Sequence, residues 1–67
     1  MITVVLNGEP ERVAAGSSLL ALLEAQGEPY DAALVERNGR LVLTERLAET
    51  TLADGDRIEV VLPAFGG

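Results

Sequence analysis

Apolar and polar residues alternate near both ends of the sequence. In the first stretch, positions 2, 4 and 6 are Ile, Val and Leu, and β-branched residues dominate. In the last stretch, Ile58 and Val60 alternate with Arg57 and Glu59. A period of two places alternate side chains on opposite faces of a sheet. The pattern therefore predicts strands over residues 2–6 and 57–62, each with one face toward the core.

The pair Asn7-Gly8 directly follows the first predicted strand. Both central residues of a type I′ turn need a positive φ, so Asn-Gly between extended segments is a strong hairpin signal. We expect the returning strand over residues 11–14. Pro10 then lies just ahead of that strand, where its missing N–H is least costly.

A second hairpin is predicted in the middle of the chain. Residues 33–37 form its first strand, Asn38-Gly39 its turn, and residues 41–43 a short return. The pattern over residues 44–53 is mixed and predicts a single helical turn with irregular chain. Asp54-Gly55-Asp56 then predicts a tight turn before the last strand.

Between the two hairpins, leucines recur at helical spacing. Leu19, Leu22 and Leu23 fall on one helical face, and Ser17 or Ser18 offers an N-cap. Gly27 suits the left-handed position just past a helix end. We therefore expect one helix over residues 18–26, in an α+β domain whose helix covers one face of one sheet.

Composition narrows the possible chemistry. The 67 residues are 48% hydrophobic and suffice for one domain. Tyr30 and Phe65 are the only aromatic residues, so aliphatic side chains must build the core. The sequence has no His and no Cys, which excludes a Cys nucleophile, a His general base and a Cys/His metal site. We expect neither a catalytic constellation nor a metal site.

Eleven acidic residues and five arginines give a net charge of −6. Such a chain repels phosphates, so we expect no nucleic-acid partner. The acidity serves solubility or steers the protein toward a basic partner surface, and the sequence leaves both open. The N-terminal residues lack a basic leader and the longest apolar run is 19–23, so we expect no membrane contact and a cytoplasmic protein.

Four segments together resemble a known family. They are VVLNGE at 4–9, ALVERNGRLV at 33–42, LADGDRIEVV at 52–61 and the terminal Gly66-Gly67. With the leucine-bearing helix they span essentially the whole chain, and they are similar to the ThiS family of sulfur carriers. Pro63-Ala64-Phe65 is similar instead to the related molybdopterin-synthase subunit MoaD.

This resemblance implies a ubiquitin-like β-grasp fold, a mixed sheet of four or five strands with one main helix. The first and last strands should be adjacent, parallel and central. Residues 1–62 would form the domain and residues 63–67 a flexible C-terminal tail. We expect the core to contain Ile2, Val4, Leu6, Val13, Leu19, Leu22, Leu23, Ile58 and Val60.

The resemblance also implies a carrier and not an enzyme. A ubiquitin-activating-type, ThiF-like adenylyltransferase would use MgATP to adenylate the Gly67 carboxylate, and a persulfide donor would convert it to a thiocarboxylate. Gly66 would give the tail access to the partner's channel. A thiazole synthase (ThiG-like) would receive the sulfur, and this chain would bind no cofactor itself.

Partner-binding residues are predicted in the first strand, the last strand and the tail. Parity places Val5 and Val61 on the sheet face away from the helix, close together if their strands pair. Leu62, Ala64 and Phe65 would extend this docking surface, unless Phe65 folds back on its own sheet. Three alternatives stay open. The protein could carry sulfur for another pathway (molybdopterin, methionine or another thioacid-dependent biosynthesis). It could also be a ubiquitin-like protein modifier, or a non-covalent interaction module.

Overall fold

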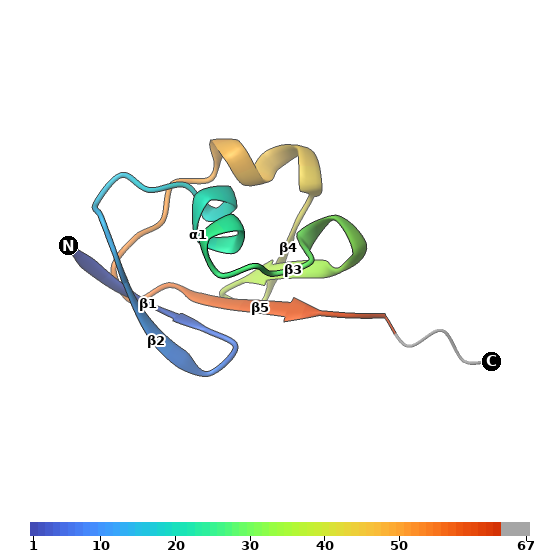
Figure 1. Cartoon of the computed structure of the whole chain (residues 1–67), viewed down its shortest axis with the longest axis horizontal. Helices are drawn as coiled ribbons and strands as arrows, with labels where there is room; N and C mark the ends of the chain where they lie inside the picture. The colour runs from blue at the N-terminus through green and yellow to red at the C-terminus, as the bar shows by residue number, and fades with distance from the viewer. Residues whose placement is uncertain (64–67) are drawn as a thin grey trace.

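Five strands and one α-helix follow one another in the predicted order (Figure 1). The computed structural model describes residues 1–63. The elements are β1 (Ile2–Leu6), β2 (Glu9–Val13), α1 (Leu19–Ala25), the 3-10 helix η1 (Tyr30–Ala32), β3 (Leu34–Arg37), β4 (Arg40–Val42), the 3-10 helix η2 (Thr44–Glu49) and β5 (Arg57–Val61).

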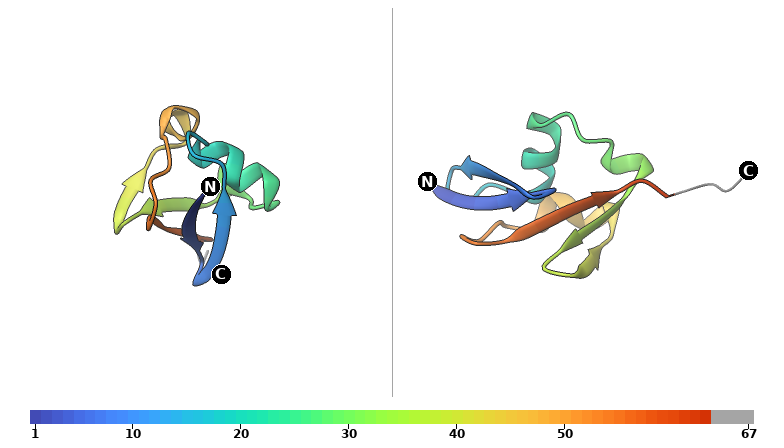
Figure 2. Two further views of the ribbon diagram at one scale, coloured as in Figure 1. Left: turned by 90° about the vertical axis from the view of Figure 1, so that its left-hand side faces the viewer. Right: turned by 90° about the horizontal axis from the view of Figure 1, so that it is seen from below.

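The strands form one sheet in the order β2-β1-β5-β3-β4. β1 and β5 pair in parallel, whereas the β1–β2, β3–β4 and β3–β5 pairs are antiparallel. The first and last strands are thus adjacent, parallel and interior, as predicted. α1 and η2 lie on the same side of the sheet (Figures 1 and 2).

Both Asn-Gly pairs form the predicted hairpin turns. Asn7 and Gly8 have φ values of 49° and 85°, and Asn38 and Gly39 have 53° and 82°. These left-handed conformations match the twist of the flanking strands in a two-residue loop. The turns set the register of both hairpins, closing on the pairs Leu6–Glu9 and Arg37–Arg40.

The helix begins and ends where its local signals predict. Ser18, not Ser17, is the N-cap, and its Oγ accepts the Ala21 N–H at 3.0 Å. Gln26 is the C-cap, and Gly27 follows with a φ of 68°. Leu19, Leu22 and Leu23 are all buried, so one face of α1 closes the core against the sheet.

Six of the nine predicted core residues are buried, and Ile2, Val13 and Val60 pack against them half-buried. The buried six are Val4, Leu6, Leu19, Leu22, Leu23 and Ile58. The prediction missed Val35, Leu47 and Leu52, which complete the core. Glu36 and Arg37 hide the alternation around Val35, and the other two leucines lie in η2 and in a loop, where no strand or α-helix period applies.

Some predicted boundaries are wrong by a few residues. β2 begins at Glu9 and therefore contains Pro10, which pairs with Val5. The Val5 N–H donates to Asp56 O on the β5 side at 2.8 Å. The backbone of Pro10 consequently faces the open edge of the sheet, where the missing N–H breaks no ladder bond.

The two 3-10 helices also correct the prediction. One turn, η1, occupies part of the expected loop at 28–31, and η2 is longer than the expected single helical turn. β5 ends at Val61, one residue before the predicted end.

Candidate functional site

The candidate site lies where β5 leaves the sheet. β5 is the middle strand of five, and its chain continues out of one end of the molecule (Figures 1 and 2). Leu62 and Pro63 follow it without regular secondary structure. The predicted modification site Gly67, the access residue Gly66 and the binding residues Ala64 and Phe65 lie outside the described residues, so their roles stay predictions.

Exposed leucines and a valine gather on the sheet face beside this exit. Val35 and Val60 pair with one another on the helix-facing side, so their neighbours Leu34 and Val61, which also pair, lie on the outer face. Leu34 is 48% exposed and Val61 is 45% exposed. By the same alternation Leu41 and Leu43 belong to this face, and both are exposed. We call Leu34, Leu41, Leu43 and Val61 the outer patch.

Val5 shares the outer face but does not adjoin Val61, and the prediction that the two lie close together is wrong. Val5 pairs with Arg57, at the opposite end of β5. Four residues at about 3.3 Å each put Val61 roughly 13 Å further along the strand. Sequence parity gives the face of a residue, whereas only the register of the β1–β5 ladder gives its neighbours.

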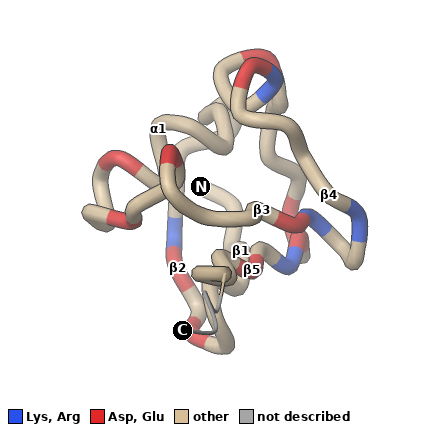
Figure 3. The backbone as a smooth tube through the Cα atoms, turned by 90° about the vertical axis from the view of Figure 1, so that its right-hand side faces the viewer, with Lys and Arg blue, Asp and Glu red and all other residues tan. Residues whose placement is uncertain are grey.

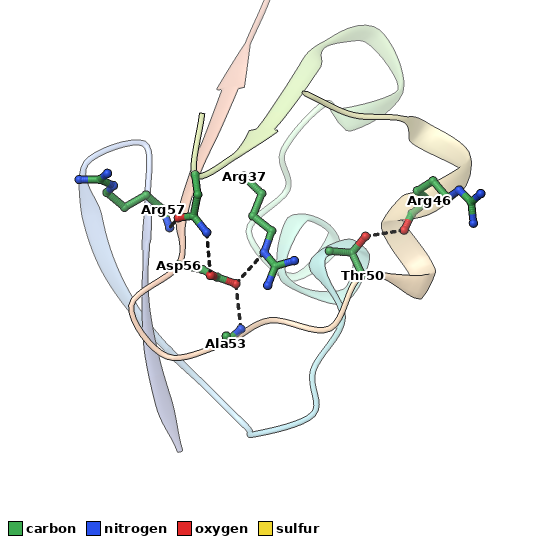
Figure 4. A network of polar contacts seen from close by, with 7 residues as sticks. Arg37, Arg46, Thr50, Ala53, Asp56 and Arg57 are labelled. Carbon is green, nitrogen blue, oxygen red and sulfur yellow. Dashed lines mark hydrogen bonds and ion pairs between the residues drawn. The ribbon is translucent and has the colours of Figure 1, made fainter. Parts of the chain in front are cut away.

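At the start of β5, the side chain of Asp56 is the centre of a polar network (Figure 4). Its Oδ2 accepts hydrogen bonds from Arg37 Nε at 2.9 Å and from the Ala53 N–H at 2.8 Å. Its Oδ1 accepts from Asn38 Nδ2 at 3.0 Å. Asp56 is only 5% exposed. The network therefore ties the β3–β4 turn to the turn that precedes β5.

Burial of Asp56 favours its protonated form, but these hydrogen bonds and the Arg37 charge outweigh that effect. Together they hold the pKa of Asp56 below its ordinary value. The carboxylate is thus ionised and fully engaged within the fold. Asp54, on the other side of Gly55 in the sequence, instead accepts a hydrogen bond from the Thr3 N–H at 2.8 Å, and this bond is exposed. Both acids serve turns, as their sequence context predicts.

The two turn asparagines do more than adopt a positive φ, and sequence reasoning missed this role. The Asn38 N–H donates to Arg57 O at 2.8 Å, and its Oδ1 accepts the Arg57 N–H at 2.9 Å. The Asn7 N–H donates to Ile58 O at 2.9 Å, and its Oδ1 accepts the Val60 N–H at 2.8 Å. Each asparagine thus bonds β5 with one main-chain donor and one side-chain acceptor.

Asn7 extends the parallel β1–β5 ladder by one step. In a parallel ladder, the N–H of a residue donates to the carbonyl that precedes its partner, and its carbonyl accepts from the N–H that follows its partner. For Asn7 the partner position is Glu59, and the two bonded groups are Ile58 O and the Val60 N–H. The amide oxygen of the side chain replaces the main-chain oxygen, which the turn directs elsewhere. The only sequence signal was the choice of Asn at the first turn position, which turn preference already explains.

Within residues 1–63, no helix is long and apolar enough to cross a membrane. In the same range, no group of three or more acidic side chains is placed to hold a metal ion.

Comparison with known proteins identifies the family. The family model of ThiS matches residues 4–67. The chain belongs to the ThiS family. The crystal structure of the thiamine biosynthesis protein ThiS from Geobacter metallireducens has a TM-score of 0.84, with 30% identity over 98% of this chain and 100% of that chain.

A solution structure of a thiamine biosynthesis protein from Geobacter metallireducens is also similar. It has a TM-score of 0.72 and 30% identity over 98% of this chain and 88% of that chain. A search of curated proteins found no match. Membership of the family makes the chain a ThiS-type sulfur carrier with a β-grasp fold.

Proposed function

We propose that this protein carries sulfur for thiamine biosynthesis as a thiocarboxylate on Gly67. The observation that carries the proposal is the match to the ThiS family through residue 67, so that Gly66 and Gly67 fall within the matched segment. The thiamine biosynthesis protein of similar fold from Geobacter metallireducens supports thiazole formation as the destination. The final acceptor is then a ThiG-like thiazole synthase.

The chemistry needs a partner, because a carboxylate has no good leaving group. In the proposed reaction the Gly67 carboxylate attacks the α-phosphate of MgATP on a ThiF-like adenylyltransferase, and pyrophosphate leaves. A persulfide sulfur then attacks the acyl carbon and displaces AMP. A second thiol then attacks the donor's sulfur in the remaining sulfur–sulfur bond, so that the donor leaves as a disulfide and the thiocarboxylate is released. This chain contributes the carboxylate and its presentation, and the partner contributes the metal ion and the charge stabilisation.

The tail has the reach and the shape for such a site. The five residues after Leu62 span at most about 17 Å when extended, at ~3.4 Å each. Gly66 and Gly67 carry no Cβ, so they pass through a narrow channel and adopt whichever backbone conformation its walls require. The folded domain can therefore stay outside while Gly67 reaches the reacting groups.

We propose the outer patch as the surface that docks on the adenylyltransferase. Its residues are apolar and exposed, and Val61 belongs to the strand that leads into the tail. A residue buried at the centre of an interface contributes most of the binding free energy, whereas the surrounding contacts exclude water. Leu62, Ala64 and Phe65 continue the apolar sequence from the patch toward Gly66. The net charge of −6 favours a basic partner surface.

Intact-mass spectrometry tests the proposal. The full chain is incubated with the adenylyltransferase, MgATP and a persulfide donor, and its mass should rise by the difference between a sulfur and an oxygen atom. A chain lacking Gly67 should unfold at the same denaturant concentration and gain no mass, because a shift of even ~1 Å can reduce the rate about 100-fold. Equal loading of the two chains would contradict the proposed role of Gly67.

A second assay separates the carrier from a protein modifier. If the loaded chain is added to cell extract, a carrier gives up its sulfur without forming heavier species. Conjugates of higher mass that resist reductant and hydroxylamine would instead indicate an amide-linked modifier.

A further inference from the structure

The β3–β4 hairpin places two arginines directly opposite one another. Arg37 and Arg40 form the pair that closes the turn, and both share the helix-facing side of the sheet with the Val35–Val42 pair. Like charges at directly opposed positions destabilise a hairpin. The chain has only five basic residues in all, and basic residues gather near the β3–β4 hairpin in Figure 3. An anion placed between the two guanidinium groups would relieve this repulsion.

Within the part of the chain that the structure describes, only one of the two arginines has an acidic partner. Arg37 Nε pairs with Asp56 Oδ2 at 2.9 Å, and in the view of Figure 4 its guanidinium group lies between Asp56 and Thr50. Asp56 already accepts two further hydrogen bonds, from Ala53 and Asn38. Arg40 makes no ion pair within residues 1–63, where the two ion pairs are Arg37–Asp56 and Arg46–Glu49. The exposed Arg40 guanidinium is therefore available to a ligand.

A groove of about 360 Å3 lies beside these side chains, lined by Arg37, Asn38, Arg40, Val42 and Thr50. The Asn38 side chain is engaged with Asp56 and Arg57, and the Thr50 hydroxyl donates to Arg46 O at 2.7 Å. The guanidinium groups are therefore the hydrogen-bond donors that the groove can offer to a ligand. A guanidinium presents its donors as a planar fork that fits two oxygens of one anion.

We propose that this groove binds an oxyanion, a phosphate group or a carboxylate, between Arg37 and Arg40. The anion offsets the repulsion between the two guanidinium groups. Its oxygens accept from the Nη groups of Arg37 and from Arg40, and Val42 forms an apolar wall beside it. The site lies at the turn end of the hairpin, separate from the outer patch and from the tail, and it does not depend on the sulfur-carrier chemistry.

Nuclear magnetic resonance titration of the full chain tests the site. Inorganic phosphate is the first probe and N-acetylglutamate the second, with chloride exchanged to keep the ionic strength constant. The amide signals of residues 38–42 and 50 should shift and saturate, with dissociation constants on the order of millimolar. Arg40→Gln should weaken the binding at least about fivefold, because it removes one charged donor. Arg12→Gln, at the exposed β2 edge, is the matched control and should bind as the native chain does.

The two probes distinguish the source of the anion. Saturation by phosphate alone indicates a free phosphate group, and saturation by N-acetylglutamate indicates an acidic side chain of a partner. The site is overturned if neither probe saturates, or if Arg40→Gln and Arg12→Gln titrate alike. A thermal measurement adds an independent readout. Arg40→Gln should melt above the native chain in phosphate-free buffer, and phosphate should raise the melting temperature of the native chain only.

Discussion

The two ends of β5 are held in very different ways. At its start, the main-chain N–H and carbonyl of Arg57 both bond to Asn38, and Arg57 pairs with Val5. The preceding Asp56 is buried, and its carboxylate accepts hydrogen bonds from Arg37, Asn38 and Ala53. At its end, Val61 pairs with Leu34 on one side, and the last bond from the β1 side is that of Asn7 to Val60. The start of β5 is thus held by buried polar bonds, whereas its end carries an exposed apolar side chain.

This difference indicates a division of labour along a single strand. Buried and fully satisfied hydrogen bonds stabilise the start, where a lost partner leaves a polar group without water. Apolar side chains stay exposed at the other end, where the strand leads to the residues proposed to react. We therefore expect substitutions at the start to change the free energy of unfolding, and substitutions at the end to change partner binding.

The largest expected effect is on partner binding at the C-terminal end of β5. Val61→Asp places a charge in the outer patch, and the affinity for the adenylyltransferase should fall on the order of 30-fold, as for a hot-spot residue. The circular dichroism spectrum should not change, because Val61 is exposed. Isothermal titration calorimetry measures the affinity.

A matched pair of milder variants locates the patch. Val61→Thr and Val5→Thr make the same change on the same face, four residues apart along the β1–β5 register. Val61→Thr should weaken binding and Val5→Thr should not. The reverse result would move the docking surface to the start of β5.

The next largest effect is on the free energy of unfolding, at the start of β5. Asp56→Asn turns one acceptor oxygen into an NH2 group that faces donors, and it should lower the free energy of unfolding by about 2 kcal/mol. The control is Asp54→Asn, whose amide oxygen can still accept the exposed Thr3 N–H, and whose effect should stay within about 0.5 kcal/mol. Urea unfolding measures both. Equal losses for the two variants would show that the Asp56 network is no more important than a surface bond.

The same network predicts a pH dependence. The pKa of Asp56 is lowered in the folded state, so the folded chain binds its proton less readily than the unfolded chain does. Its contribution to stability is fully present above the unfolded pKa of about 3.9 and is lost as the pH falls through the lower folded pKa. The stability difference between the native chain and Asp56→Asn should therefore be constant from neutral pH to about 5 and shrink below about 4. A difference that stays constant to about pH 2 would contradict the assigned cause.

The smallest effect is expected at Asn7. Asn7→Gly keeps the positive φ of the turn and removes the side-chain oxygen that accepts the Val60 N–H, which should cost about 1 kcal/mol. Hydrogen exchange should show faster exchange at Val60. Asn38→Gly should cost more, because it also removes a part-buried bond to Asp56, whereas the further bond that Asn7→Gly removes, to Glu28, is exposed. Unchanged exchange at Val60 in Asn7→Gly would mean that the side-chain bond does not hold the end of β5.

Local signals in the sequence predicted most of this fold. Three of these signals depend only on neighbouring residues: the Asn-Gly pairs, the leucine spacing after Ser18 and the alternation around Ile58. The structure has the turns, the helix and the strand that they predict. Leu47 and Leu52 could not be assigned to the core in that way. They are buried because η2 and the following loop pack over α1, which is a tertiary effect without a local period.

For the candidate site too, local patterns predicted one part, and the register between distant strands determines the rest. The faces of Val5 and Val61 followed from parity, but their separation depends on the offset between two strands that lie 50 residues apart in sequence. Leu34, Leu41 and Leu43 joined the outer patch only once the β3–β5 register was known. The bonds from Asn7 and Asn38 to β5 were hidden because turn chemistry alone accounts for both residues.

The most direct test of this division of labour is the rate at which two variants are loaded with sulfur. Asp56→Asn and Val61→Asp are compared with the native chain by intact-mass spectrometry, at a low temperature where circular dichroism shows all three to be folded. Asp56→Asn should gain sulfur at the native rate in spite of its lower stability, whereas Val61→Asp should be loaded at least about tenfold more slowly at a subsaturating concentration of the chain. If loading instead falls in proportion to stability, or if Val61→Asp loads at the native rate, the two ends of β5 do not have the separate roles described above.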